Sequence, residues 1–385
     1  MSKKLIYFHD GPVFKDENGV QFGNTFDLDM FERYQYLADK VEFCQRVLLK
    51  EDTEGFRNLN EEGLFTHEIT PFNRPHTLHN YFKSKKKIHA LVEEADLMIV
   101  RVPSTIGSIA YWHGRKTNKP ILLEVVGCPW DSLSNHSTLG RIYARFSMKK
   151  QQKIAWDADY SIYVSENFLQ SRYPTQGKSA GISDVFLKKA FDENPKLTNY
   201  KNIDLDKTIN LGTLAAINIR YKGHDLVLKA ISELKKKGLK FKYFCAGNGS
   251  SERLSNLAEK LGVRDSVEFV GLLDHSEIND LLLKLDIYVQ PSRQEGLPRA
   301  VVEAMNCGCA CIGSSVGGIP ELLDDKVIFE TDDLNGLIEK LTQYDNQEIF
   351  VEQSQKNFET AKKYGYDYLN AKRHSFYDSF LDSIS

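Results

Sequence analysis

Short apolar segments rich in β-branched residues alternate with helical patterns along the whole chain. The segments predicted to be strands lie at 3–9, 40–49, 96–102, 119–126 and 159–165, then at 209–215, 240–246, 266–271, 286–290, 309–314 and 326–330. Helices are predicted between them, at 26–38, 82–94, 105–118, 223–237, 251–262, 275–284, 298–307 and 334–345. Such alternation is typical of parallel sheets with helices on both faces, and therefore of an α/β fold.

The pattern divides the chain into two parts. The predicted strands are too many for one typical sheet, and the alternation restarts after a polar interval at roughly 187–207. A length of 385 residues suits two domains, since one domain takes roughly 150 residues. We therefore predict domains at 1–190 and 191–352, followed by a helical segment at 353–385.

Composition excludes several classes of protein. The chain is 41% hydrophobic and 27% charged, as in ordinary globular proteins, and its net charge of -3 gives no general attraction to nucleic acid. We see neither a signal peptide nor an apolar run near the roughly 20 residues that span a bilayer. Cys307, Cys309 and Cys311 are too closely spaced for a usual zinc site, so the six cysteines indicate buried thiols and a cytoplasmic protein.

Two glutamates in the segment 292–321 form the most informative pattern. Glu295 and Glu303 are separated by seven residues, with a Gly-Leu-Pro turn between them. Proline favours a first helical position, so a helix should begin at Pro298, with Glu295 just before it and Glu303 inside it. Helical side chains tilt toward the N-terminus, which brings Glu303 toward Glu295. Carboxylates beside free helix N–H groups suit a ligand with hydroxyls and a diphosphate, namely a nucleotide sugar.

Several neighbouring motifs match a known family together with this pair. They are Ser292…Glu295-Gly296-Leu297-Pro298, Glu303-Ala304-Met305, Gly308, Gly317-Gly318…Glu321, Lys222-Gly223, Gly247-Asn248-Gly249 and Gly271-Leu272-Leu273. The chain resembles retaining glycosyltransferases of family 4, whose GT-B fold has two facing Rossmann-like domains with parallel sheets. The match is strong over about 209–322 and weaker over 1–190. The segment 124–131, EVVGCPWD, is similar to a bacterial surface-polysaccharide branch.

The resemblance implies a donor site in the second domain and an acceptor side in the first. Lys222 would neutralise the leaving diphosphate, Glu303 would accept hydrogen bonds from the ribose, and Glu295 would hold hydroxyls of the transferred sugar. Other implied contacts are Gly296, Leu297, Pro298, Gly247, Gly271 and Leu272. The segment 353–385 would return to the first domain, as it does in this fold.

One position departs from the family pattern. The family usually has arginine where Gly212-Thr213-Leu214 has threonine, which cannot supply a guanidinium group. Arg220, two residues before Lys222, is the candidate to replace it.

The first domain offers weaker candidates. His9 and Gly11 close the first predicted strand and are candidate acceptor or phosphate contacts, and Asp131 and His136 are candidates on the acceptor side. Asp-x-Asp motifs at 27–29, 157–159 and 204–206 resemble the metal clamp of other glycosyltransferases, but none sits clearly in a strand-end loop. We expect no required metal and no cofactor apart from the donor.

The predicted function is retaining transfer of a sugar from a nucleoside diphosphate sugar, with UDP- or GDP-sugars favoured. The acceptor would be a hydroxyl of a saccharide or lipid-linked glycan in capsule or lipopolysaccharide synthesis. Basic residues in the first half favour peripheral contact with the inner face of the membrane: Lys83, Lys85, Lys86, Lys87, Arg141, Arg145, Lys149, Lys150 and Lys153.

Three alternatives remain open from the sequence. A nucleotide-sugar epimerase or a phosphorylase would use the same fold, and a non-catalytic protein would bind the donor without releasing nucleoside diphosphate. A nicotinamide dehydrogenase is least favoured, because no Gly-x-Gly-x-x-Gly follows an early strand.

Overall fold

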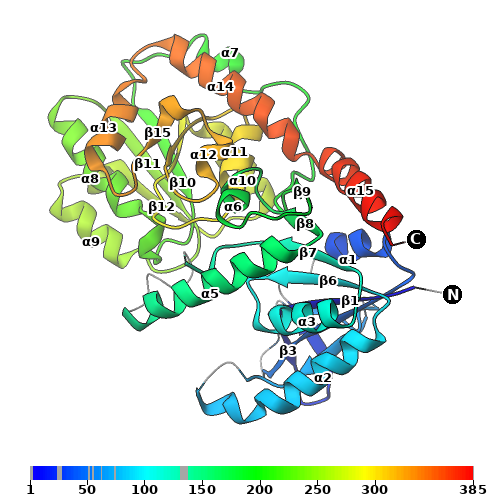
Figure 1. Ribbon diagram of the computed structural model, residues 1–385. Coiled ribbons are helices and arrows are strands. Elements are labelled where there is room, and N and C mark those ends of the chain that lie inside the picture. Colours follow the sequence, from blue (N-terminus) through cyan, green and yellow to red (C-terminus); the bar gives the residue numbers. More distant parts are fainter. Residues whose placement is uncertain are drawn as a thin grey trace. The chain divides into compact units, whose positions relative to one another are not determined.

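The chain folds into two units, each built around its own sheet (Figure 1). Unit 1 comprises Met1–Ile182 and Lys372–Ser385, and unit 2 comprises Ser183–Ala371. The computed structural model describes residues 3–23, 28–50, 53, 56–61, 63–72, 75–130 and 138–384.

The chain passes from unit 1 to unit 2 after Ile182 and returns to unit 1 at Lys372, whereas the predicted boundaries lie at 190 and 353. The segment after Ile182 joins unit 2 because Leu187 is buried in the core of that unit and pairs with Gly365. Helix α14 (Gln347–Ala361) also belongs to unit 2, where Phe350 and Ala361 lie in the core.

The end of the chain belongs to unit 1. A 3-10 turn, η5 (Lys362–Tyr364), separates α14 from the last helix, α15 (Tyr366–Asp382). Ser379 of α15 accepts a hydrogen bond from the Tyr160 hydroxyl at 2.8 Å, and Asp378 accepts one from Tyr36 at 2.7 Å. The predicted single helical stretch is therefore two helices, of which the second ends in unit 1.

Unit 1 has a mixed sheet in the order β4-β2-β1-β6-β7-β8-β9, with β3 beside β1 and β5 beside β3. The parallel strands are β1 (Lys4–Lys15), β3 (Lys40–Leu49), β5 (Thr66–Ile69), β6 (Leu97–Val102), β7 (Ile121–Val125), β8 (Tyr160–Tyr163) and β9 (Lys178–Gly181). Two short strands, β2 (Gln21–Gly23) and β4 (Arg57–Asn58), are antiparallel. The helical elements are α1 (Leu28–Gln35), η1 (Pro75–Asn80), α2 (Tyr81–Glu94), α3 (Thr105–Lys116), α5 (Thr138–Asp157) and α6 (Phe168–Arg172).

The first strand is longer than predicted. It continues past residue 9 to Lys15, and its register with β3 shifts between Phe8 and Pro12. A shift of this kind is a bulge, which bends a strand and turns its side chains. His9, Asp10 and Gly11 therefore lie in a bulge within β1 and do not end the strand.

Unit 2 has a parallel sheet in the order β12-β11-β10-β13-β14-β15. Its strands are β10 (Ile209–Leu214), β11 (Phe241–Ala246), β12 (Val267–Gly271), β13 (Ile287–Gln290), β14 (Ala310–Ser314) and β15 (Ile328–Phe329). Its other helical elements are α7 (Leu197–Tyr200), η2 (Arg220–Lys222), α8 (His224–Lys236), α9 (Glu252–Lys260), η3 (Arg264–Ser266), α10 (His275–Lys284), α11 (Arg299–Asn306), α12 (Ile319–Leu322), η4 (Asp325–Val327) and α13 (Leu334–Thr342). Helices cover both faces, which is why Ile287, Tyr288 and Val289 are all buried.

The strand order places a ligand site in each unit. In unit 2, β10 lies between β11 and β13, so the chain changes direction across the sheet between β10 and β13. In unit 1 the same change occurs between β1 and β6. Ligands of open α/β sheets bind beyond the carboxyl ends of the strands at such points.

Two further expectations concern the whole chain. All six cysteines are buried and free, as predicted. Within the described ranges, the helices are all too short or too polar to span a membrane.

Candidate active site

Glu295 lies in the loop after β13, and its Oε1 atom receives three hydrogen bonds. Lys222 Nζ donates at 2.7 Å, the Ser292 hydroxyl at 2.7 Å and Gln290 Nε2 at 2.9 Å. The carboxylate side chain is 9% exposed, so it is held in place on one side and open only narrowly to solvent. No described residue donates to the Oε2 atom, which leaves that oxygen available to a ligand hydroxyl.

Buried polar groups hold this arrangement from behind. The Tyr288 hydroxyl donates to Gln290 Oε1 at 2.6 Å, which fixes the amide so that its nitrogen faces Glu295. The Ser314 hydroxyl donates to the Ser292 carbonyl at 2.6 Å. A network whose members are all paired restricts the carboxylate to one orientation.

Lys222 reaches Glu295 from η2, in the loop after β10. The next residue, Gly223, has φ 78°, and any side chain there would overlap the carbonyl oxygen of Pro291. Arg293 joins the loop after β13 to η2 and α8, because its guanidinium donates to the Arg220 carbonyl at 2.6 Å and to both Asp225 oxygens at 2.9 Å. Only glycine permits this close approach, so Gly223 sets the position of the lysine.

The turn after Glu295 rests on a pair of glycines. Gly318 N donates to the Gly296 carbonyl at 2.7 Å, and Gly317 has φ 62°. A Cβ atom on Gly317 would overlap the Glu295 carbonyl oxygen and lie 2.8 Å from that of Gly296. The Gly-Gly motif therefore shapes the turn that carries Glu295.

Glu303 lies in the second turn of α11 without a hydrogen-bond partner among the described residues. Burial raises the pKa of its carboxyl group, because a charged carboxylate is poorly solvated there. Burial also raises the pKa of Tyr288, and the charges of Glu295 and Glu303 raise it further. The helix begins at Arg299 with Pro298 as its N-cap, one residue later than predicted.

Thr213 is unable to take the place of the family arginine. It is fully buried, its hydroxyl donates to the Val289 carbonyl at 2.7 Å, and it accepts a hydrogen bond from Tyr243 at 2.9 Å. Arg220 lies in the same 3-10 turn as Lys222 and is exposed. Its guanidinium has no ion-pair or hydrogen-bond partner among the described residues, and its role stays a prediction.

The remaining predicted donor contacts lie at the ends of β11 and β12. Gly247 N donates to the Gly271 carbonyl at 2.7 Å, and both glycines have positive φ values. Leu272 is 78% exposed, so it is free to contact a ligand. Their roles in binding stay predictions.

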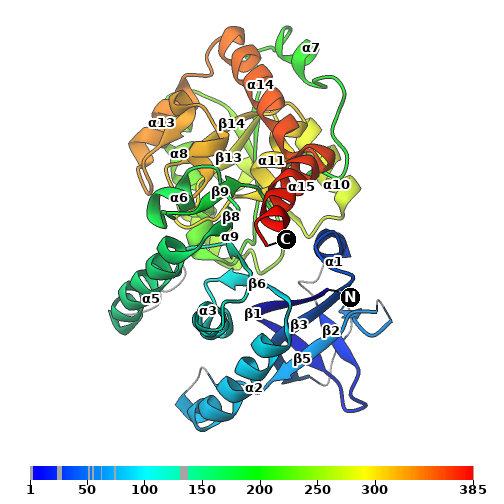
Figure 2. The same ribbon diagram turned by 45° about the vertical axis from the view of Figure 1, so that its right-hand side comes forward.

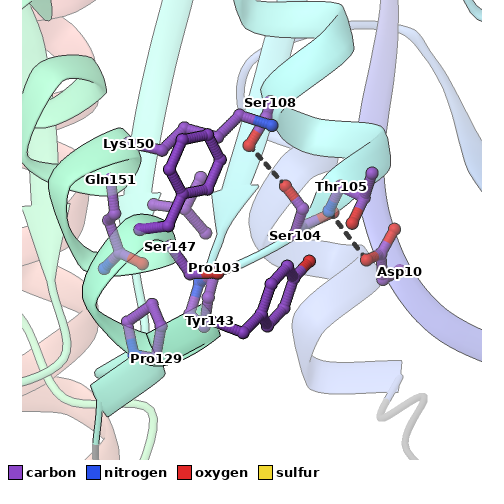
Figure 3. A pocket seen from close by; sticks show the side chains of 12 residues that line it. Asp10, Pro103, Ser104, Thr105, Ser108, Pro129, Tyr143, Ser147, Lys150 and Gln151 are labelled. Carbon is purple, nitrogen blue, oxygen red and sulfur yellow. Dashed lines mark hydrogen bonds between the residues drawn. The ribbon is translucent and has the colours of Figure 1, made fainter. Parts of the chain in front are cut away.

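Unit 1 has a cavity of about 300 Å³ beside the bulge of β1 and the carboxyl end of β6 (Figure 3). Asp10, from the bulge of β1, accepts hydrogen bonds from Thr105 N at 2.7 Å and Ile106 N at 2.9 Å. It therefore caps α3, whose N-terminal dipole favours a negative charge. The cavity is lined by Asp10, Val102, Pro103, Ser104, Thr105, Ser108, Pro129, Tyr143, Phe146, Ser147, Lys150 and Gln151.

Two polar side chains of this cavity are unsatisfied among the described residues. Lys150 has neither an ion pair nor a hydrogen bond, and burial lowers the pKa of its ammonium group. Gln151 is 3% exposed and donates to the Gly127 carbonyl, but its Oε1 atom has no partner. A cation and an acceptor beside the aromatic rings of Tyr143 and Phe146 suit a polyhydroxylated ligand. The sequence patterns indicated Lys150 only as one of the basic residues of the first half and did not indicate Tyr143, Phe146 or Gln151, because no helix was predicted at 138–157.

Of the other candidates in the first domain, the structure describes His9 and Gly11, which are hydrogen-bonded to each other. His9 Nδ1 accepts a hydrogen bond from Gly11 N at 3.0 Å, and burial together with the charge of Arg101 lowers the pKa of His9 to about 4. The imidazole is therefore neutral at physiological pH. Asp131 and His136 lie outside the described residues.

In the Asp-x-Asp motif at 157–159, both carboxylates have protein partners. Asp157 accepts from the Tyr111 hydroxyl at 2.8 Å and pairs with Arg115, which also pairs with Asp159. Over the described parts of the chain, groups of three metal-ligating side chains are absent. The motif at 27–29 includes residues that the structure does not describe.

Two Rossmann-like units followed by returning C-terminal helices define the GT-B fold of glycosyltransferases. HepE from Anabaena, solved in complex with UDP, superposes with a TM-score of 0.65 at 15% identity, over 99% of this chain and 100% of that one. In sequence, the family described as "Glycosyl transferases group 1" matches residues 206–364.

One curated relative extends this match over almost the whole chain, and another matches part of it. Protein CapJ of Staphylococcus aureus is 31% identical over 356 residues, which cover 91% of this chain and 87% of CapJ. The putative colanic acid biosynthesis glycosyltransferase WcaL of Escherichia coli is 34% identical over 110 residues, 27% of either chain. The chain belongs to the group 1 glycosyl transferases.

Proposed function

We propose that this glycosyltransferase is a retaining enzyme of family 4 that uses a nucleoside diphosphate sugar as donor. The observation that carries the proposal is the geometry of Glu295, whose Oε1 atom is fixed by three donors while Oε2 stays available. The unpaired Glu303 would accept hydrogen bonds from the ribose, and Lys222 would meet the diphosphate. UDP- and GDP-sugars are the favoured donors, and HepE, which shares the fold, was solved with UDP.

The arrangement supports transfer with retention at a single face of the sugar. Glu295 is engaged by Lys222, Gln290 and Ser292, so it suits the binding of sugar hydroxyls better than nucleophilic attack. The acceptor oxygen would bond to the anomeric carbon on the face from which the diphosphate leaves. The hydroxyl proton would pass to the departing phosphate oxygen, whose growing charge Lys222 would stabilise.

The acceptor is proposed to be a hydroxyl of a growing bacterial surface glycan, free or linked to a lipid at the inner face of the cell membrane. The unit 1 cavity offers Lys150 and Gln151 Oε1 as partners for hydroxyl groups and aromatic rings as an apolar wall. The likeness to WcaL, named for colanic acid biosynthesis, supports this class of acceptor.

Ligand binding to the donor site is tested by a thermal-shift screen with UDP-, GDP-, ADP- and TDP-sugars, because a bound ligand stabilises the native state. Glu303→Ala and Lys222→Ala should abolish the shift, whereas Glu295→Ala should keep it and lower turnover. Lys237 is the exposed C-cap residue of α8 in unit 2, and Lys237→Ala is the matched control that should behave as wild type. The site assignment is wrong if all three site variants keep wild-type transfer rates. NMR of the product then reads the anomeric configuration.

A further inference from the structure

Unit 1 exposes large apolar side chains at the first turns of two helices. On α2 and the preceding η1, Phe82 is 80% exposed and Leu78 is 58% exposed. On α5, Ile142 is 67% exposed and Phe146 is 69% exposed, with Tyr143 between them. Proteins that act alone in water rarely gather apolar side chains on one face, so this surface is expected to meet a partner.

Basic side chains accompany these apolar groups along both helical segments, and neither segment contains an acidic residue. The segment 75–92 contains four lysines and no Asp or Glu, and 138–156 contains five Lys or Arg and no Asp or Glu. Along the sequence the nearest acids, Glu93 and Asp157, lie at the opposite ends of these helices and are engaged by His113 and Arg115. In space, Asp10 lines the unit 1 cavity with Lys150, but its carboxylate accepts hydrogen bonds from Thr105 N and Ile106 N. In the described structure, Lys83, Lys86, Lys149 and Lys153 form no ion pair.

The two helices contribute to one continuous surface. In both Figure 1 and Figure 2 the N-terminal ends of α2 and α5 lie on the same side of unit 1, with α3 between them. A hollow joins all three helices: it is lined by Tyr81 and Lys85 of α2, Trp112 and Lys116 of α3, and Lys150 of α5. We call this surface, from Leu78 to Lys87 and from Arg141 to Lys153, the basic apolar face.

We propose that the basic apolar face docks unit 1 on an anionic lipid membrane. Apolar side chains that stand beside lysines and arginines suit a bilayer interface, where rings enter the acyl boundary and cations meet lipid phosphates. Each basic side chain at an anionic surface strengthens binding by about fivefold. Burial of a phenylalanine or isoleucine strengthens it by roughly tenfold or more. A water-soluble protein partner would need a complementary acidic surface, whereas the membrane supplies both properties at once.

Docking stands apart from the proposed transferase reaction. One consequence of docking does rest on that reaction. Tyr143, Phe146 and Lys150 of the basic apolar face also line the unit 1 cavity, so a lipid-linked acceptor would leave the membrane beside this cavity.

Sedimentation of the full chain with protein-free vesicles tests the docking. The vesicles are phosphatidylcholine alone or phosphatidylcholine with phosphatidylglycerol. Wild type should bind the anionic vesicles more tightly, and raised salt should weaken the binding, since salt screens exposed charges. Phe82→Glu and Ile142→Glu, which line neither cavity, should each lower the partition coefficient by about tenfold or more.

Charge reversal has a matched control in the other unit. Lys86→Glu with Lys149→Glu should weaken binding to anionic vesicles by at least about twentyfold. Lys237→Glu with Lys240→Glu changes the net charge equally on exposed sites of unit 2 and should leave binding unchanged. Leu239→Glu is the control for the apolar substitutions.

Two outcomes would overturn the proposal. Wild type that stays in the supernatant with both vesicle types at low salt rules out lipid as the partner and leaves recruitment by a protein. Equal losses in the unit 2 controls would show that net charge, not this face, drives binding. The thermal shift caused by nucleotide sugar is measured on the same variants, so that this test is separate from the test of the donor site. A variant that loses vesicle binding but keeps the wild-type thermal shift has lost docking and not donor binding.

Discussion

The turn that carries Glu295 rests on Gly317, and replacing that glycine tests the geometry of the site while keeping every proposed donor contact. Gly317→Ala retains the backbone amide and adds one methyl group. The added Cβ atom would overlap the Glu295 carbonyl oxygen and lie 2.8 Å from the Gly296 carbonyl oxygen. The turn must therefore move for the variant to fold.

The substitution should lower the free energy of unfolding for two separate reasons. The φ angle of 62° is unfavourable for alanine by roughly 1–2 kcal/mol. The steric overlap adds roughly 1–3 kcal/mol, as insertion of a methyl group into a packed region usually does. Because unstrained carbon contacts lie near 3.5 Å, the turn has to shift by roughly 1 Å. A displacement of that size at a reacting group lowers activity by about 10²-fold.

Gly262→Ala provides the matched control. Gly262 follows α9 in the same unit with φ 68°, and no atom lies within 4 Å of where its Cβ would stand. Urea unfolding should show a loss of about 1–2 kcal/mol for Gly262→Ala and about 2–5 kcal/mol for Gly317→Ala. Only Gly317→Ala should lose sugar transfer, measured as nucleoside diphosphate release in the presence of acceptor.

The reasoning fails if the two variants unfold at the same urea concentration and both keep the wild-type rate of transfer. The Gly-Gly pair would then be an ordinary turn, and the position of Glu295 would not depend on it.

Two further predictions concern single carboxylates. Burial raises the pKa of Glu303, so folding favours its protonated form and ionisation destabilises the fold as the pH rises through the unfolded and then the folded pKa. Glu303→Gln should therefore raise the free energy of unfolding at neutral pH, but not below the pKa of the unfolded state, and donor binding should be lost. Urea titrations that show the same gain in the free energy of unfolding at both pH values would contradict this. Asp10→Ala removes the acceptor for Thr105 N and Ile106 N and should cost about 1–2 kcal/mol in the same assay. An unchanged midpoint would mean that Asp10 does not cap α3.

Hydrophobic periodicity predicted the main strands because they are buried on both faces. Every strand predicted from the sequence overlaps an observed one, and Ile287–Gln290 shows why: all four side chains are buried. The missed strands β2, β4, β5 and β9 are two to four residues long and contain few apolar side chains. Backbone pairing with a neighbouring strand holds them in place, and such pairing leaves no pattern in the local sequence.

The donor site was predictable only in part. The spacing of Glu295 and Glu303 around a helix start is local, and the structure has that helix within one residue of the predicted start. The contact between Lys222 and Glu295 joins residues 73 positions apart, and it depends on β10 and β13 being neighbours in the sheet. Strand order is a property of the whole fold, so this ion pair could be expected from family resemblance but not from spacing.

The missed helix α5 is informative for a physical reason. Its first turns place Ile142, Tyr143 and Phe146 in solvent, so apolar side chains do not fall on one buried face and the usual helical pattern is weak there. Natural sequences break such local rules mainly where function requires it. All three residues belong to the basic apolar face, and Tyr143 and Phe146 also line the unit 1 cavity.

The two units use charge in opposite ways at equivalent points of their sheets. In unit 2 the cation Lys222 is paired with Glu295, and Glu303 has no partner among the residues that the structure describes. In unit 1 the carboxylate Asp10 is committed to the N-terminus of α3, and Lys150 is the group without a partner in the described part of the chain. An unpaired, partly buried charge is costly, so each unit retains one where a ligand can satisfy it. A diphosphate entering unit 2 would compete with Glu295 for Lys222, and that carboxylate would then need the sugar hydroxyls that the donor itself brings.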